Sequence, residues 1–280
     1  MTDEHPAAAL PTGKRSIFPV KTIPGLSAVA VISIAVLYAP VFALVVHSFH
    51  AGDSGALWQG FSLKWYVAAL ENREVREAFM RSLTVAASAS AIATVAATMA
   101  AVARTRTFPG RTAIHLLINQ PVMMPEIIMA AALLIVFASI KAATGYAGLG
   151  YLILAHAAFC VPVAYLPVRA RLESIDLNLE MAAADLYATP WQAFRRITLP
   201  LMAPGIAAGA ILAFVISLDD VIISEFVKAA GQDTLPTYML GQLRQTVTPE
   251  INAISTALIA LTAILLCIFF VLSPTRERKS

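Results

Sequence analysis

The sequence predicts an all-α, polytopic membrane protein with six transmembrane helices and both termini in the cytosol. Hydrophobic residues make up 59% of the 280 residues and charged residues only 13%, against about 25% charged residues in a soluble protein. The charges separate six apolar runs, each long enough at about 20 residues to cross a bilayer. Thirteen of the 20 lysines and arginines lie in the tails and in the second and fourth loops, and the positive-inside rule places those segments in the cytosol.

The six apolar runs define the organisation of the chain. Residues 23–273 are expected to form one six-helix transmembrane domain. Residues 1–22 are polar and proline-rich, without a small-residue cleavage site after the first run, which predicts a cytosolic N-terminal tail and not a removable signal peptide. Residues 274–280 are the expected cytosolic C-terminal tail. The runs lie between Lys21 and His47, Arg81 and Arg104, Arg111 and Lys141, Lys141 and Arg169, Arg196 and Lys228, and Glu250 and Arg276.

The first loop on the outer side contains the stretch ENREVREAFMR, Glu71 to Arg81. Its glutamates offset its arginines at helical spacing, and such pairs stabilise an exposed helix. The stretch therefore predicts a short amphipathic helix outside the membrane.

The net charge and the two cysteines argue against a nucleic-acid surface, a disulfide framework and a metal site. The net charge of +3 is small and spread over every polar segment, so no nucleic-acid partner is predicted. Cys160 and Cys267 both lie in apolar runs, where neither a disulfide framework nor metal-ligand spacing is visible. We expect both cysteines to be packing residues and the chain itself to hold no metal and no cofactor.

The longest polar interruption on the cytosolic side runs from Arg169 to Leu199. Its pattern predicts two short helices: Ser174 or Asp176 caps the first, and Thr189 caps the second with Pro190 at its first helical position. Small alanines leave one face of the first helix flat enough for another protein to approach closely. The alternative is a connector that lies on the bilayer surface.

This loop resembles the "EAA" cytoplasmic loop of permease subunits from bacterial ABC importers. Ala182, Ala183, Ile197, Leu199 and Pro200 fall in register with that pattern. Two positions depart from it. The usual glutamate aligns with Met181, with Glu180 one place early, and the usual glycine aligns with Tyr187, where a left-handed turn would strain a tyrosine. The resemblance implies an ATPase-docking helix formed by Glu180, Met181, Ala182, Ala183, Asp185, Leu186, Tyr187 and Ala188.

Three further stretches narrow the branch of the family. PVMMPEIIMAAALLIVF, SLDDVIISEF and TLPTYMLGQLRQTVTPEINAISTALI are similar to the second permease subunit of spermidine/putrescine importers. Relatives with this signature also carry opines, amino-acid derivatives and other small organic solutes. The resemblance implies the type I ABC importer permease fold. It places the protein in a bacterial inner membrane, with membrane lipid around its helices. It also implies a second homologous permease, two cytosolic ATPase subunits that hold ATP and Mg²⁺, and an extracytoplasmic solute-binding protein.

The sequence gives no support to two other functions, an intramembrane enzyme and a purely structural membrane subunit. The chain has no G-x-x-x-x-G-K-[ST] phosphate loop, so ATP hydrolysis is expected on another chain. An intramembrane enzyme would need a nucleophile with a base, or metal ligands, at helical spacing. None is visible, and His115 and His156 are isolated in different helices, so we predict packed or interfacial histidines and no catalytic residue. A purely structural subunit would not need acids within its spans.

The acids within the fifth run predict a polar path. On one continuous helix, Ser217, Asp220 and Ser224 form a narrow stripe, with Asp219 turned about 100° away. A carboxylate in a bilayer costs at least ~2.5 to 3.5 kcal/mol, so the stripe should face the bundle or a pore, where a cationic substrate supplies the missing charge. The alternatives are a partner arginine or the cap of a broken helix.

Three further acids have weaker signals. Glu225 lies nearer the outer end of the run, where an interfacial role is equally consistent with the sequence. Glu126 and Glu250 each follow a proline, as at a helix N-terminus. For Glu250 we favour that capping role. Glu126 opens the third helix in a polar, proline-interrupted segment of the kind that lines pathways in transporters, so we include it among the path residues.

Overall fold

The structure is a computed structural model that describes residues 25–53, 58–105, 124–146, 148–176, 178–245 and 248–272. These residues are almost entirely helical, and their one extended pairing is an isolated bridge between His50 and Phe61. Six helices within them are long and apolar enough to cross a membrane. The all-α, six-helix prediction is therefore confirmed for this part of the chain. The predicted tails, residues 1–22 and 274–280, lie outside it, as do His115 and the polar segment before Met124.

The chain divides into two compact units, residues 1–46 and 47–280. The first unit contains most of α1, Leu26–His47, whose side chains are exposed from Ser27 to Ala43. A helix that is apolar on every side and exposed in this way is typical of a membrane span, because lipid can cover it.

The second unit contains the other helices. Its transmembrane segments are built from α3, α5, α6, α9 and α12, and the short helices connect them. In chain order they are α2 (Lys64–Glu71), α3 (Arg73–Arg104), α5 (Glu126–Thr144), α6 (Gly150–Glu173), α7 (Asn178–Asp185), α8 (Pro190–Ala193), the π-helical turn η2 (Phe194–Thr198), α9 (Leu199–Asp219), α10 (Ile222–Val227), α11 (Leu235–Leu243) and α12 (Pro249–Leu272).

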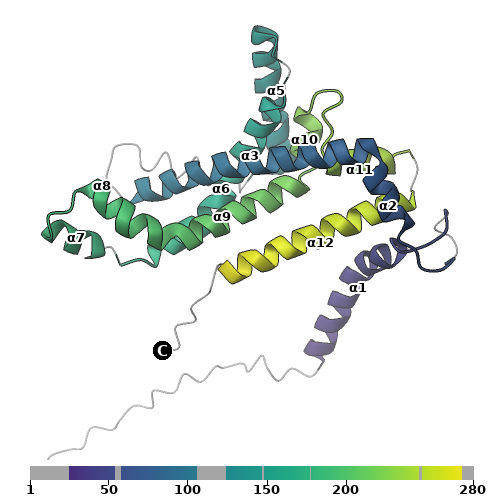
Figure 1. Cartoon of the computed structure of the whole chain (residues 1–280), viewed down its shortest axis with the longest axis horizontal. Coiled ribbons are helices and arrows are strands. Elements are labelled where there is room, and N and C mark those ends of the chain that lie inside the picture. Colours follow the sequence, from purple (N-terminus) through teal and green to yellow (C-terminus); the bar gives the residue numbers. More distant parts are fainter. Residues whose placement is uncertain are drawn as a thin grey trace, which may run out of the picture. The chain divides into compact units, whose positions relative to one another are not determined.

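The centre of the second unit is the packing of α3, α6 and α9 against one another (Figure 1). One face of α3 is a stripe of buried alanines that includes Ala93, Ala97 and Ala101. Opposite them lie Ala164 on α6 and Ala213 on α9. Small side chains let helix backbones approach closely, which is how membrane helices gain van der Waals contact without a hydrophobic driving force. This packing gives the site described below a rigid base.

Helices α6 and α9 approach each other closely at Gly209. A Cβ atom added there would lie 2.7 Å from the backbone oxygen of Ala164. Because that neighbour is backbone, it cannot rotate away as a side chain would. Gly209 therefore sets the distance between the two helices that carry the site.

The prediction of a separate amphipathic helix over Glu71 to Arg81 is wrong. Glu71 ends α2, and the rest of the stretch is the first part of α3, which begins at Arg73 and continues into the membrane span. The predicted charge pairing does occur, with Arg73 Nε 2.7 Å from Glu77 Oε1. The side chain of Asn72 accepts a hydrogen bond from the backbone N–H of Glu74 and starts α3.

The loop from Arg169 to Leu199 contains the predicted caps. Asp176 Oδ1 accepts from the N–H of Asn178 at the start of α7, while the Ser174 hydroxyl donates to the Arg171 carbonyl at the end of α6. Thr189 caps α8 in a capping box with Gln192, and Pro190 follows it. Of the two alternatives for the first cap, the structure therefore has Asp176.

The second predicted short helix is not independent, because α8 continues through η2 into α9. Pro200 lacks the N–H that an α-helix would direct to the Arg196 carbonyl, and a local π register accommodates such a loss. Residues 190–219 consequently form one 30-residue membrane span. The loop and the site at the far end of α9 are thus joined by continuous helix.

The close approach at Gly209 gives a test of the packing. Gly209→Ala should destabilise the permease by about 1–3 kcal/mol, since the new methyl group overpacks a backbone contact. Gly241→Ala is the matched control, because a Cβ added to Gly241 on α11 meets no atom within 4 Å. The measurement is the thermal unfolding midpoint of the purified protein in detergent. Equal midpoints for the two variants would contradict the assigned packing.

Candidate functional site

The fifth membrane span ends at a break in the helix, and Asp220 lies at that break. α9 ends at Asp219, Asp220 has an extended backbone (φ −67°, ψ 130°), and α10 begins at Ile222. The Asp220 carboxylate accepts hydrogen bonds from the backbone N–H groups of Ser224, at 2.8 Å, and Ile223, at 3.3 Å. The prediction of one continuous helix through this stretch is therefore wrong. The alternative that Asp220 caps a broken helix is the one that the structure has.

The residues of the predicted stripe still come together, around a residue from another helix. Imidazole Nδ1 of His156, on α6, is 2.8 Å from the hydroxyl of Ser217, and Nε2 is 2.9 Å from the hydroxyl of Ser224. Nε2 is also 3.4 Å from Asp220 Oδ2, and the side chains of His156 and Asp220 are each only 1% exposed. Helix α6 thus contributes one ring that contacts both sides of the break.

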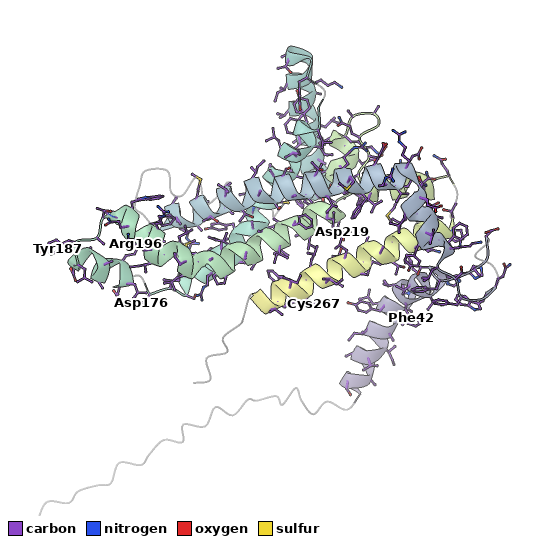
Figure 2. All side chains as sticks on the ribbon, in the orientation of Figure 1. Phe42, Asp176, Tyr187, Arg196, Asp219 and Cys267 are labelled. Atoms are coloured by element: carbon purple, nitrogen blue, oxygen red, sulfur yellow. The ribbon has the colours of Figure 1, made fainter. Side chains whose placement is uncertain are left out.

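A cavity of about 380 Å³ lies beside the break. Three carboxyl groups line it, from Asp219, Asp220 and Glu126, which is the first residue of α5. The Glu126 carboxyl group is close enough to that of Asp220 to interact with it. Asp219, unlike Asp220, is exposed (Figure 2). The remaining walls are the apolar side chains of Phe159, Val215, Ile216, Val221 and Ile222.

This arrangement favours an organic cation. Carboxylates that share a cavity repel one another, and an ammonium group between them removes that repulsion. Phe159 lines the cavity, and aromatic rings attract cations through their faces, while the aliphatic wall suits methylene groups. Among the residues that the structure describes, no group of histidine, cysteine and acidic side chains could hold a metal ion.

Glu225 lies in a different cluster. Its carboxylate is 2.5 Å from Lys228 Nζ and 3.8 Å from Arg244 Nη1, and Lys228 also contacts Asp233 at 2.7 Å. Burial alone would lower the pKa of the Lys228 ammonium, but its hydrogen bonds with Asp233 and Glu225 outweigh burial and raise that pKa. Glu225 therefore has cations of its own chain beside it, which matches the interfacial alternative.

The two acids that follow prolines both lie at helix starts. Glu126 is the first residue of α5 after Pro125, and Glu250 follows Pro249 at the start of α12. Glu250 also accepts a hydrogen bond from the Asn72 side chain at 3.0 Å. Glu250 thus fastens α12 to the start of α3, whereas Glu126 reaches the cavity.

The predicted docking helix is α7, and its residues face in two directions. Ala183 is buried, and Glu180 accepts a hydrogen bond from the buried hydroxyl of Thr198 on η2. These two residues hold α7 to its own chain, which leaves the exposed side chains of α7 accessible to a partner. Met181, Ala182, Asp185, Leu186 and Tyr187 are exposed, and Ala188 is half-buried.

Tyr187 occupies the left-handed turn that the family usually gives to glycine. Its φ is +61°, and Ala188 and Tyr187 donate backbone hydrogen bonds to Ala183 and Ala184, which closes α7 with a Schellman motif. The expected strain is therefore accepted and the turn is kept. The Tyr187 side chain is 96% exposed and lies at the end of the ribbon in Figure 2. Leu186 and Trp191, on either side of it in the sequence, are exposed as well.

Most of the chain matches one known protein family. Residues 91–274, which contain the predicted docking loop and the break, match the family described as "Binding-protein-dependent transport system inner membrane component". The chain belongs to this family. The permease is therefore a multi-pass protein of a bacterial inner membrane and a transport subunit, not an enzyme.

The permease is similar to several curated proteins over most of its length. It is 35% identical over 266 residues to the putrescine transport system permease protein PotI of Escherichia coli (strain K12), covering 93% of this chain and 95% of the relative. It is 35% identical over 232 residues to the spermidine/putrescine transport system permease protein PotC of the same strain, with 82% and 87% covered. The PotC of Haemophilus influenzae is 36% identical over 247 residues, with 88% and 93% covered.

Solved structures share the fold at lower identity. A chain of a bacterial ABC transporter involved in the import of the acidic polysaccharide alginate has a TM-score of 0.67 and 18% identity, covering 89% of the permease and 92% of that chain. A chain of the MetNI methionine ABC transporter in an inward-facing conformation has a TM-score of 0.56 and 18% identity, covering 70% and 94%. The ABC importer permease fold is therefore shown, independently of substrate.

Sequence reasoning missed one residue of the site, His156. It was interpreted as isolated because its partners lie 61 and 68 positions away in the chain. One signal was available: an imidazole well inside an apolar span is costly in a membrane unless polar groups surround it.

Proposed function

We propose that this permease forms part of the pathway by which an ATP-driven importer moves a polyamine such as putrescine or spermidine into the cytoplasm. The observation that carries the proposal is the cavity at the α9–α10 break, in which Asp219, Asp220 and Glu126 face one space with apolar walls. A polyamine alternates ammonium groups with methylene chains. The ammonium groups can pair with the carboxyl groups of the cavity, and the methylene chains can contact its apolar walls. The names of the relatives that cover most of the chain, putrescine and spermidine/putrescine permeases, support the same substrate class.

The proposal includes the assembly around the chain. The permease pairs with a second, homologous permease, the two rest on two ATPase subunits that bind ATP and Mg²⁺, and a solute-binding protein delivers the substrate from outside. Support for the binding protein comes from the family description, and one structural relative was solved in complex with a periplasmic protein. The excess of lysine and arginine supports a cytosolic location for both termini and for the loop from Arg169 to Leu199.

The exposed tip of that loop is the proposed docking surface for an ATPase subunit. Exposed aromatic and aliphatic side chains at the end of a rigid element are suited to a pocket on a partner. The continuous helix from Pro190 to Asp219 joins the loop to the cavity. Closure of the ATPase pair would then move α7 and α8, and α9 would carry that movement to the break, where the cavity changes its accessible side.

The cavity carboxylates are tested by neutral, similarly shaped substitutions. Asp219→Asn should lower putrescine or spermidine uptake about tenfold or more, because it removes a charge that the substrate needs. Its effect on assembly should be small, since the Asp219 side chain holds no part of the helix break. Asp220→Asn should lower uptake at least as much. The measurement is uptake of labelled polyamine per assembled complex in membrane vesicles.

Glu225→Gln is the control for this experiment, because Glu225 has Lys228 and Arg244 beside it and lies outside the cavity. Its uptake per complex should stay within about twofold of the parent, because the charge that it removes lies outside the cavity and Lys228 keeps Asp233 as a partner. Unchanged uptake per complex in both aspartate variants would remove these residues from the pathway. A different result would indicate a structural ion pair. In that case the aspartate variants would destabilise the assembled complex by ~3 to 5 kcal/mol, and the complexes that remain would show normal uptake.

The docking surface is tested at Ala182, whose small exposed side chain lies beside the buried Ala183. Ala182→Trp should leave the permease folded in the membrane and abolish its co-purification with the ATPase subunits, because the indole blocks close approach. Ala182→Ser is the matched control and should behave as the parent. Ala183→Trp is not informative, since overpacking the loop itself would produce the same loss. Normal co-purification and ATP turnover in Ala182→Trp would contradict the assignment.

A further inference from the structure

We propose that His156 is a positioning residue that holds the α9–α10 break in one geometry and thereby aims the Asp220 carboxylate at the cavity. Its imidazole contacts Ser217, three residues before Asp220, and Ser224, four residues after it. Each contact alone would fasten one helix to α6. Together they fix α9 and α10 relative to each other through one rigid ring.

The chemistry of the ring suits this role. In a neutral imidazole one nitrogen donates and the other accepts, while a serine hydroxyl can do either. Both contacts are therefore satisfied in either tautomer. A phenyl ring has nearly the same size but would leave both serine hydroxyls buried without that partner, and unpaired buried polar groups favour rearrangement.

The consequence for Asp220 follows from its surroundings. Its carboxylate receives two backbone N–H groups from α10, and its Oδ2 lies 3.4 Å from His156 Nε2. On its open side it lines the cavity with Glu126. If α10 turned relative to α9, the carboxylate would turn with the N–H groups that bind it. His156 thus acts on the cavity without lining it.

The groups packed around His156 support a positional role over a purely space-filling one. Cys160, one turn further along α6, donates to the Ala213 carbonyl of α9, so α6 also contacts α9 before the break. Ile223 is fully buried and anchors α10 among Ala130 of α5 and Ala155 of α6. The Cys160 hydrogen bond and the packing of Ile223 therefore hold α9 and α10 near α6. The two hydrogen bonds of His156 select the orientation of α9 relative to α10.

The first experiment rests on the proposed function and measures polyamine uptake per assembled complex. His156→Phe should lower the maximal rate about tenfold while KM changes by less than about twofold, because the defect lies in the membrane path and not in solute capture. Ser217→Ala and Ser224→Ala each cut one contact and should each lower the rate by a smaller factor. His156→Gln retains a polar group toward Ser224 and should recover part of the rate.

Two controls accompany these variants. Ser90→Ala removes a buried hydroxyl of α3 that donates within its own helix, to the Ala87 carbonyl, and should leave the rate per complex unchanged. In an Asp220→Asn background, His156→Phe should add little further loss, since the residue acts through Asp220. Multiplicative losses in the double variant, or full uptake per complex in His156→Phe, would overturn the proposal. If His156→Phe does not assemble, the two serine variants decide by the same criteria.

The second experiment needs no transported substrate. Ile222 lines the cavity and is partly exposed, so Ile222→Cys is a reporter of the local potential. The rates of labelling by a cationic and by a neutral methanethiosulfonate of similar size are compared in the assembled complex, with the parent chain correcting for Cys160 and Cys267. Adding His156→Phe should lower the cationic-to-neutral ratio about threefold or more.

The two experiments separate the two proposals. If the parent complex takes up neither putrescine nor spermidine, the proposed function fails, and the labelling ratio still decides the role of His156. A ratio that stays the same after His156→Phe would overturn the positioning role. A ratio that falls as far in Ser90→Ala would do the same, because the effect would then not depend on the break.

Discussion

The structure depends on one constraint, the presence of a buried carboxylate at the end of a membrane span. Asp220 is satisfied by two backbone N–H groups, and those groups are free only because the helix breaks there. The break in turn needs support, since backbone polar groups cannot be left open to lipid. His156 and the two serines provide that support. The same break opens a cavity in which the aspartates and Glu126 meet, so the stabilising feature and the proposed substrate path are one arrangement.

The rest of the fold positions this break. The alanine stripe of α3 and Gly209 of α9 bring three helices close enough to act as a single rigid group, and α6 carries His156 within that group. At the other end of α9, the π turn η2 connects the span to α8, and Glu180 fastens α7 to it through Thr198. A movement at the exposed loop tip is therefore transferred by helix and not by flexible chain.

The sequence was sufficient for the six membrane spans, the family and most of the residues that the structure brings to the break, because apolar length, charge position and capping patterns are local signals. It identified Asp219, Asp220, Ser217, Ser224 and Glu126, which the structure gathers around one break and its cavity. It predicted one continuous helix through that stretch, since SLDDVIISEF has no proline or glycine, although it offered Asp220 as the cap of a broken helix as an alternative. His156 was missed because its partners are distant in the chain. Likewise, only the packing of α7 on η2 distinguishes the buried Ala183 from the exposed Ala182.

Asp220 and His156 together hold the start of α10. Amide hydrogen exchange of the segment Ile222–Val227, measured on the permease in lipid nanodiscs, tests it most directly, because the N–H groups of Ile223 and Ser224 are those that the carboxylate binds. The account predicts slow exchange in the parent and faster exchange in both Asp220→Asn and His156→Phe, with α3 unchanged as the internal reference. Exchange in α10 that is the same in all three proteins would contradict it.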